Sequence, residues 1–99
     1  MEITKNFENG VLSLALRGRL DTTTAPQFEA ELAPSLPEAK NVVLDFEGLE
    51  YISSAGLRLL LMAKKALPAD GDVTVRHACA DILEIFDITG FADLLILED

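Results

Sequence analysis

The stretch Asn41-Val42-Val43-Leu44-Asp45-Phe46 and the residues that follow it decide the fold of this chain. Its continuous apolar run is typical of a strand that is buried on both faces of a parallel sheet. A more polar segment then leads to Ser53 and Ser54, either of which can cap a helix that runs to about Ala66. A buried strand that feeds directly into a helix predicts an α/β protein.

Upstream of this strand the sequence predicts a β-hairpin. Two short apolar runs, Glu2–Phe7 and Val11–Leu16, flank the pair Asn9-Gly10. Both residues of that pair tolerate a positive φ, and a tight hairpin turn requires this. We therefore expect the first strand to be antiparallel to the second and to lie at or near an edge of the sheet.

A helix is expected between the hairpin and the buried strand. Three threonines, Thr22, Thr23 and Thr24, offer N-caps, and Pro26 suits the first turn. Thr24 and Gln27 have the spacing of a capping box. The apolar stripe of this helix is Phe28, Leu32 and Leu36, and Pro34 is expected to end or kink it.

The C-terminal part continues the alternation of helix and strand. Pro68 and Asp70-Gly71 end the central helix and turn the chain into a short strand, Val73–Val75. A third helix is predicted over Asp81–Thr89, with Gly90 at its C′ position, and a last strand over Leu94–Leu97. The predicted fold class is α/β: an N-terminal hairpin, then αβαβαβ, with a mostly parallel sheet and packed helices in one domain, residues 1–99.

Composition limits the functions that this chain can have. It has 99 residues, one cysteine and one histidine, and its net charge is −9. The charge disfavours contact with nucleic acid or anionic membranes and favours a protein partner with a basic patch, although it can also serve solubility alone. The polar N-terminus is no signal peptide, so we expect a cytoplasmic protein, and we expect a monomer.

Two segments are expected to lie just beyond strand ends, where partner sites gather in such sheets: Arg17–Asp21 and Gly48–Leu57. Ser54 lies at a helix start, whose unpaired N–H groups and partial positive charge suit a phosphate. Gly56 leaves the backbone there open to a close approach. The alternative is that Ser54, or its neighbour Ser53, is a simple N-cap.

The helix after Ser54 is unusually apolar. Helical spacing places one set of residues on the inner side: Leu57, Leu60 and Leu67. It places another set on the opposite side, with Lys64 nearer the inner side: Arg58, Met62 and Lys65, adjoined by Ala55, Leu59 and Ala66. This outer side is either a docking surface or is covered by neighbouring helices.

The sequence offers little for catalysis. No arrangement of serine, histidine and aspartate has supporting local spacing, and no glycine-rich phosphate loop is present. His77 and Cys79 flank an expected strand-to-helix loop, but a metal or nucleophile role for this pair is disfavoured. We expect no enzyme, no cofactor and no metal site. A small hydrolase or nucleotide-binding enzyme would need a reactive centre that the sequence does not show.

Three motifs in order resemble the STAS family, and within it the bacterial anti-sigma factor antagonists. The first is Gly18-Arg19-Leu20-Asp21 followed by threonines. The second and most specific joins Val42-Val43-Leu44-Asp45-Phe46 to Tyr51-Ile52-Ser53-Ser54-Ala55-Gly56-Leu57-Arg58, and the third is Ile85-Phe86-Asp87-Ile88-Thr89-Gly90-Phe91. The resemblance covers nearly the whole chain.

This resemblance implies a partner-switching mechanism. In the family, the dephosphorylated antagonist binds an anti-sigma factor that is also a serine kinase, which frees a sigma factor for transcription. The kinase then phosphorylates the antagonist, and a metal-dependent serine phosphatase reverses the reaction. The phosphorylated residue corresponds to Ser54, with Ser53 as second choice because a serine stands here in place of the family's acidic residue.

The resemblance also implies a partner-binding surface around Ser54. Its expected members are Asp21, Thr22, Thr23, Ser53, Ala55, Gly56, Leu57, Arg58, Leu59 and Met62. An alternative function is a STAS scaffold or regulatory subunit of a larger assembly, such as a stress-sensing particle or a lipid-transport complex. In that function Ser54 is only a helix cap and carries no phosphate.

Overall fold

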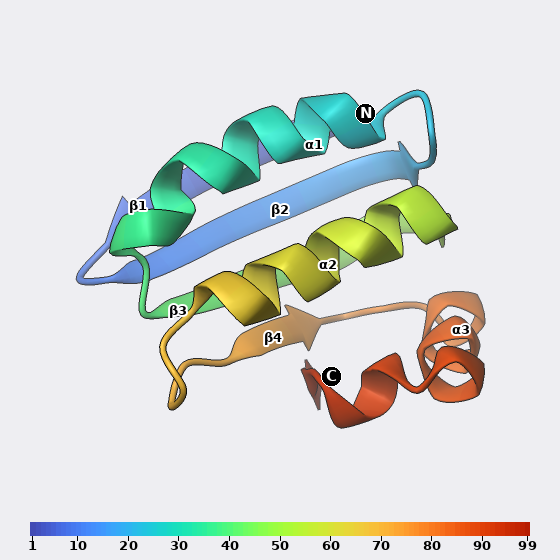
Figure 1. Ribbon diagram of the computed structural model, residues 1–99. Coiled ribbons are helices and arrows are strands. Elements are labelled where there is room, and N and C mark those ends of the chain that lie inside the picture. Colours follow the sequence, from blue (N-terminus) through green and yellow to red (C-terminus); the bar gives the residue numbers. More distant parts are fainter.

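The computed structural model describes residues 1–99 and contains one five-stranded sheet (Figure 1). Its strands are β1 (Glu2–Glu8), β2 (Val11–Leu20), β3 (Asn41–Ile52), β4 (Val73–Arg76) and β5 (Ile96–Glu98). The spatial order is β1-β2-β3-β4-β5, which is also the order along the chain. β1 pairs antiparallel with β2, and every other neighbouring pair is parallel. The predicted hairpin and mostly parallel sheet are confirmed.

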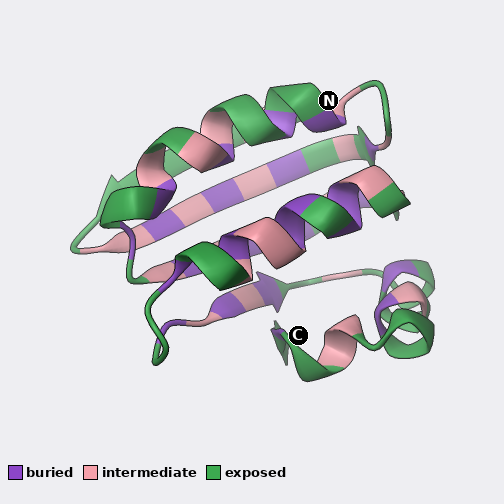
Figure 2. Cartoon of the chain, in the orientation of Figure 1, coloured by how far each residue is buried: buried purple, intermediate pink, exposed green.

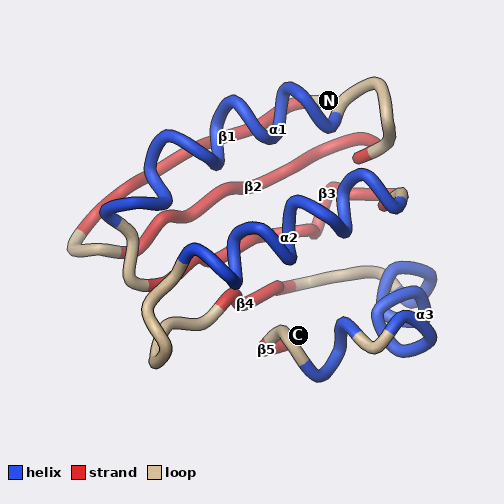
Figure 3. Tube along the Cα trace, viewed as in Figure 1, coloured by secondary structure: helices blue, strands red, loops and turns tan.

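The connections between the parallel strands carry the helical segments. These are α1 (Ala25–Leu32), the 3₁₀ helix η1 (Ala33–Glu38), α2 (Ser54–Ala66), α3 (Ala80–Thr89) and the 3₁₀ helix η2 (Phe91–Asp93). Because successive crossovers run in one direction and share one hand, α1 and α2 lie side by side on the same face of the sheet (Figure 3). None of these helices is long and apolar enough to cross a lipid bilayer.

The two faces of the sheet differ in burial. Residues of β2 and β3 alternate between buried and half-buried along the first part of each strand (Figure 2). The buried set, which includes Leu12, Leu14 and Leu44, packs under the helices. Val43 and Asp45 point to the opposite face and are only half-buried. The prediction that this strand is buried on both faces is wrong, because no helix crosses to the second face.

The hairpin turn has the predicted backbone geometry. Asn9 has φ 54° and Gly10 has φ 80°, so both turn residues lie in the left-handed region. β2 and β3 are longer than expected, since Arg17–Leu20 and Gly48–Ile52 continue the strands instead of forming loops. They remain in the sheet because Leu20, Leu49 and Ile52 are buried and extend the core.

Helix limits follow proline and glycine as predicted, with differences at the C-terminus. α1 ends at Leu32, and Pro34 lies in the 3₁₀ helix η1 that follows. Leu36 is buried as expected, but it belongs to η1 and not to α1. Gly90 closes α3 with φ 83°. The last strand begins at Ile96 and not at Leu94, because the N–H groups of Leu94 and Leu95 both donate to the Phe91 carbonyl oxygen in the turn that follows η2. The ring of Phe86 packs on that of Phe46, with 6.5 Å between the centroids.

Candidate functional site

The ends of β2 and β3 are joined directly at the start of α2. The Ser53 N–H donates to the Leu20 carbonyl oxygen at 2.8 Å. This bond places the end of the first expected segment, Arg17–Asp21, against the helix start in the second segment. The structure thus brings the two segments together at the ends of β2 and β3, although most of each segment lies inside its strand and not beyond the strand end.

Ser53 and Ser54 have different roles at the start of α2. Ser53 is the N-cap, with extended backbone, and its Oγ accepts from the Gly56 N–H at 3.4 Å. Its carbonyl accepts the first helical bond, from the Leu57 N–H at 2.9 Å. Ser54 is the first helical residue, and its exposed hydroxyl makes no hydrogen bond. The reading of Ser54 as the helix cap is therefore wrong, and its hydroxyl is free for other chemistry.

Gly56 faces the protein interior. A Cβ at this position would lie 2.7 Å from Leu20 Cγ and 2.8 Å from Ile52 Cγ1. The absence of a side chain thus lets the first turn of α2 approach the ends of β2 and β3. The expectation that Gly56 keeps the backbone open to an outside molecule does not fit this packing.

A hydrogen-bonded network fixes the loop before α1. The Asp21 carboxylate accepts from the Thr23 N–H at 3.0 Å and the Thr24 N–H at 3.1 Å. The Thr24 hydroxyl donates to the Arg19 carbonyl at 2.7 Å and accepts from the Asp21 N–H at 2.9 Å. Chiefly because of the bond from the Thr24 N–H, the pKa of Asp21 lies below its usual value. Asp21 is therefore charged at neutral pH.

The predicted capping box at Thr24 and Gln27 is wrong. The Thr24 side chain makes no capping bond to the first turn of α1. The Gln27 amide instead donates to the Met1 carbonyl at 2.9 Å. The Thr24 hydroxyl does not cap the helix because it is already bonded to the Arg19 carbonyl and to the Asp21 N–H.

A groove of about 340 Å³ separates the first halves of α1 and α2. Its lining residues are Thr22, Ala25, Pro26, Glu29, Ala55, Arg58, Leu59 and Met62. Residues from the first part of α1 and of α2 thus line an apolar floor, with one acid, Glu29, and one base, Arg58, at the sides. No ion pair joins Glu29 to Arg58, so both charges can reach a partner.

The outer side of α2 is partly covered. Leu57 and Leu60 are buried, as predicted, and Leu59 is buried as well, with 7% of its surface exposed. Met62 is half-buried against the core, whereas Arg58 and Lys65 are exposed. Lys64 reaches past the end of the helix to donate to the Gly71 carbonyl at 2.8 Å. The expectation that neighbouring helices cover this side is therefore correct for Leu59. The expectation of an open surface is correct for Arg58 and Lys65.

The structure adds residues that the sequence reasoning missed. Leu61 lies in a shallow depression with Arg58, Met62 and Lys65, and Pro26 and Glu29 line the groove from α1. Helical spacing already contained part of this signal, because Leu61 is about 60° from Arg58 around the helix axis. The contribution of α1 could not be read in this way, because it depends on how two helices pack.

Of the ten expected partner-binding residues, five line the groove and the other five do not. Those that line the groove are Thr22, Ala55, Arg58, Leu59 and Met62. Gly56 and Leu57 are buried, and Asp21 and Ser53 are engaged in local hydrogen bonds. Thr23 is exposed but lies outside the groove lining.

Two arginines lie near the residues of this site, Arg19 in β2 and Arg58 in α2. The Arg19 guanidinium lies over the Tyr51 ring, 4.4 Å from its centroid, and its Nε is 3.9 Å from an Asp21 carboxylate oxygen. Arg58 is exposed, makes no ion pair, and lies four residues after Ser54. Residues at this spacing are neighbours on a helix surface, about 5–6 Å apart at Cβ.

Comparison with known proteins identifies a matching family model and similar sequences. Residues 3–98 match the family model described as "Mlab, STAS domain". BtrV from Bordetella bronchiseptica, whose name assigns it to the anti-sigma factor antagonists, is 38% identical over 95% of this chain and 83% of its own. The anti-sigma-B factor antagonist of Staphylococcus aureus is 31% identical over 96% of this chain and 90% of its own.

A solved structure shares the fold. The unphosphorylated form of the anti-sigma factor antagonist SpoIIAA superposes with a TM-score of 0.79 at 19% identity, over 99% of this chain and 88% of that one. The fold is that of a small α/β domain built on one five-stranded sheet. The chain belongs to the STAS domain family, as the matched residues and the relatives together show.

Proposed function

We propose that this chain is an anti-sigma factor antagonist and that phosphorylation of Ser54 switches it off. One observation carries the proposal: Ser53 caps α2, so the adjacent Ser54 presents an exposed and unbound hydroxyl at the helix start, beside the groove between α1 and α2. The names of the relatives support the class of function. The partner is then an anti-sigma factor, which acts as the serine kinase, and a serine phosphatase restores the active form in the cytoplasm.

The start of α2 can carry a phosphate on Ser54 without loss of the fold. Phosphorylation adds about −1.5 to −2 charges, which the positive end of α2 tolerates. Arg58 lies one turn further along the same helix and makes no ion pair, so it is free to neutralise part of this charge. The phosphorylated monomer is therefore expected to stay folded.

The same phosphate opposes docking. A partner seated on the groove would bury the phosphate, and burial of an unmatched dianion is costly. In addition, Arg58 would be drawn to the phosphate and withdrawn from the partner. A loss of about 3 kcal/mol weakens binding by more than a hundredfold.

The first test is peptide mass spectrometry of the protein purified from its native cells, with and without phosphatase treatment. The expected result is a phosphatase-sensitive phosphate on Ser54. A phosphate on Ser53 alone would move the switch by one residue. A chain that stays unmodified under every growth condition would favour the scaffold function and contradict the proposal.

A binding experiment then separates charge from position. Ser54→Ala is expected to bind the anti-sigma factor constitutively, and Ser54→Asp to bind it poorly while remaining folded by circular dichroism. Ser53→Asp is the matched control, since aspartate is a good N-cap and adds the same charge one residue away. Equal binding of Ser54→Asp and the parent protein would contradict the switch.

A further inference from the structure

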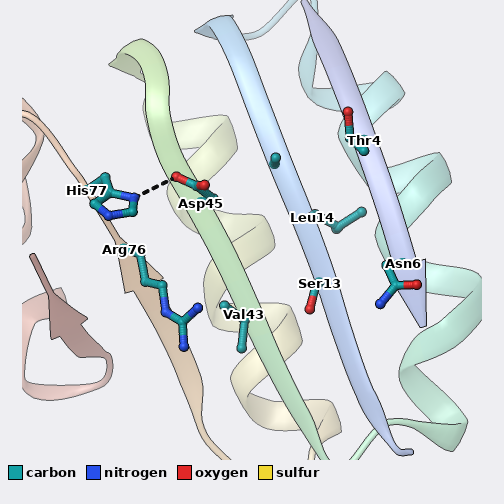
Figure 4. A pocket seen from close by; sticks show the side chains of 9 residues that line it. Thr4, Asn6, Ser13, Leu14, Val43, Asp45, Arg76 and His77 are labelled. Carbon is teal, nitrogen blue, oxygen red and sulfur yellow. Dashed lines mark hydrogen bonds and ion pairs between the residues drawn. The ribbon is translucent and has the colours of Figure 1, made fainter. Parts of the chain in front are cut away.

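Three metal-ligating side chains converge on the face of the sheet that no helix covers. Asp45 and Glu47 belong to β3, and His77 follows β4 directly. One carboxylate oxygen from each acid and one ring nitrogen of His77 all lie within 4.8 Å of one another. Figure 4 shows the imidazole of His77 pointing at the carboxylate of Asp45 across the two strands.

A β-bulge brings the two carboxylates to this point. Between the pairs Ala15–Asp45 and Arg17–Gly48, β2 advances by two residues and β3 by three. The extra residue bends β3, and the Glu47 N–H turns to donate to Asp45 Oδ1 at 3.0 Å. The bulge therefore holds the Asp45 carboxylate in place while the Glu47 side chain remains exposed and free of hydrogen bonds.

The backbone of His77 brings the imidazole to the same point. His77 has φ 61°, a left-handed conformation that is uncommon outside glycine. Its N–H donates to the Glu98 carbonyl of β5 at 3.1 Å, which fixes this turn to the sheet. As a result, His77 Nδ1 and Asp45 Oδ1 form a hydrogen bond of 3.0 Å.

We propose that Asp45, Glu47 and His77 form a binding site for a divalent transition-metal cation of the zinc type. One imidazole nitrogen and two carboxylate oxygens are a ligand set that such ions accept, at about 2.0–2.2 Å from each atom. In a tetrahedral site two such ligand atoms lie about 3.3–3.6 Å apart. His77 Nδ1 and Asp45 Oδ1, which now share a hydrogen bond of 3.0 Å, therefore have to separate slightly, and Nδ1 has to give up its proton to bind the ion. Glu47 has to close in as well, and its side chain is free to rotate.

The charges around the site permit a cation. Arg76 is the neighbouring base, and its Nε donates to Glu98 Oε1 at 2.8 Å, so a carboxylate already offsets its charge. The hydrogen bond from the Glu47 N–H, and then that from the His77 side chain, hold the pKa of Asp45 below its usual value. Three protein ligands leave coordination positions for water, on the side of a hollow of about 260 Å³ that Asp45, Arg76 and His77 help to line.

The sequence alone could not bring these ligands together. Counts of cysteine and histidine led to the expectation of no metal site, and His77 was weighed only with its neighbour Cys79. Asp45 and His77 are far apart along the chain, and only the parallel pairing of β3 with β4 makes them adjacent. Cys79 is not part of the converging group.

The test is a titration of the full-length, untagged protein with zinc chloride, followed by calorimetry and proton NMR. Because His77 is the only histidine, its ring signals are unambiguous. The expected result is saturable binding of one ion per chain, with a shift of those ring signals. Absence of saturable binding up to about 1 mM zinc would overturn the proposal.

Variants assign the ligands. Glu47→Gln and His77→Asn are expected to weaken binding at least tenfold, and asparagine tolerates the positive φ of His77. Glu50→Gln, a second exposed glutamate on β3, and Cys79→Ser are expected to leave the affinity unchanged. Loss of binding in Cys79→Ser, or equal affinities for Glu47→Gln and Glu50→Gln, would place the ion elsewhere and overturn the proposal.

Discussion

The starts of α1 and α2 are both rich in hydroxyl groups, yet they use them in opposite ways. Before α1, the Thr24 hydroxyl and the Asp21 carboxylate are both consumed by bonds within the loop and to the end of β2. Before α2, Ser53 alone makes the capping bond, and the Ser54 hydroxyl is left exposed. At the start of α1 the side chains therefore hold the loop in place, whereas at the start of α2 one hydroxyl is left exposed and unbound.

The difference arises from how each helix meets the sheet. α2 begins directly after β3, and Gly56 lets its first turn pack closely on Leu20 and Ile52. The backbone contact with the strand ends already fixes the helix, so Ser54 is not needed as a cap. α1 begins after a loop of several residues, which requires side-chain bonds to give it one conformation.

The largest loss of stability is expected from Gly56→Ala, which adds a methyl group where the first turn of α2 packs on the ends of β2 and β3. The new methyl group would lie within 3 Å of Leu20 and Ile52 side-chain carbons. Such overpacking costs about 1–3 kcal/mol, which a urea denaturation midpoint would show. Gly90→Asn is the control, because nothing lies within 4 Å of a Cβ at Gly90 and asparagine tolerates its positive φ. Equal midpoints for Gly56→Ala and the parent protein would mean that the helix start adjusts freely.

A smaller loss of stability is expected from Thr24→Ala, which removes the side-chain hydrogen bonds that hold the loop before α1. The substitution removes one hydrogen bond to the Arg19 carbonyl and one from the Asp21 N–H. The expected loss is about 1–2 kcal/mol of unfolding free energy, again from urea denaturation. Thr22→Ala is the matched control, since Thr22 is exposed and its side chain makes no hydrogen bond. If both variants lost the same stability, the network would not be what fixes the loop.

The contribution of Asp21 is smaller still, because its side chain is open to water, and it depends on pH. The pKa of Asp21 is lowered in the folded protein, mainly by the Thr24 N–H, so the ionised form favours folding. This stabilisation is present above the unfolded pKa of about 3.9 and is lost as the pH falls through the folded value. Asp21→Asn keeps the acceptor oxygen and removes the titration.

The measurement for Asp21 is the unfolding midpoint from pH 7 down to pH 2. The parent protein is expected to lose more stability than Asp21→Asn below about pH 4. Part of the acid dependence should persist in the variant, because Asp45 also has a lowered pKa. Parallel curves for the two proteins would show that the charge of the Asp21 carboxylate contributes nothing to the stability of the folded protein.

The architecture could be predicted from the sequence, but the different roles of the hydroxyl groups at the two helix starts could not. Asn9-Gly10, the alternating leucines of β2 and the serines after β3 report local conformation, which short-range sequence patterns encode. The one-sided sheet escaped prediction because an apolar run such as Val42–Leu44 looks the same whether one face or two is covered. Thr24 was misassigned because its partners, Arg19 and Asp21, compete with the helix for the hydroxyl.

The smallest effect on stability is expected from Ser54→Ala, and this result is the most informative about function. The Ser54 hydroxyl is exposed and makes no hydrogen bond, so its removal should change the unfolding free energy by less than about 0.5 kcal/mol. Ser53→Ala, one residue away, should cost about 0.5–1 kcal/mol, toward the low end for a cap because its bond is 3.4 Å long. Urea denaturation of both variants compares them directly. A loss above about 1 kcal/mol in Ser54→Ala would show that the hydroxyl supports the helix. Phosphorylation would then disturb the fold itself, and the proposed switch at the binding surface would no longer account for inactivation.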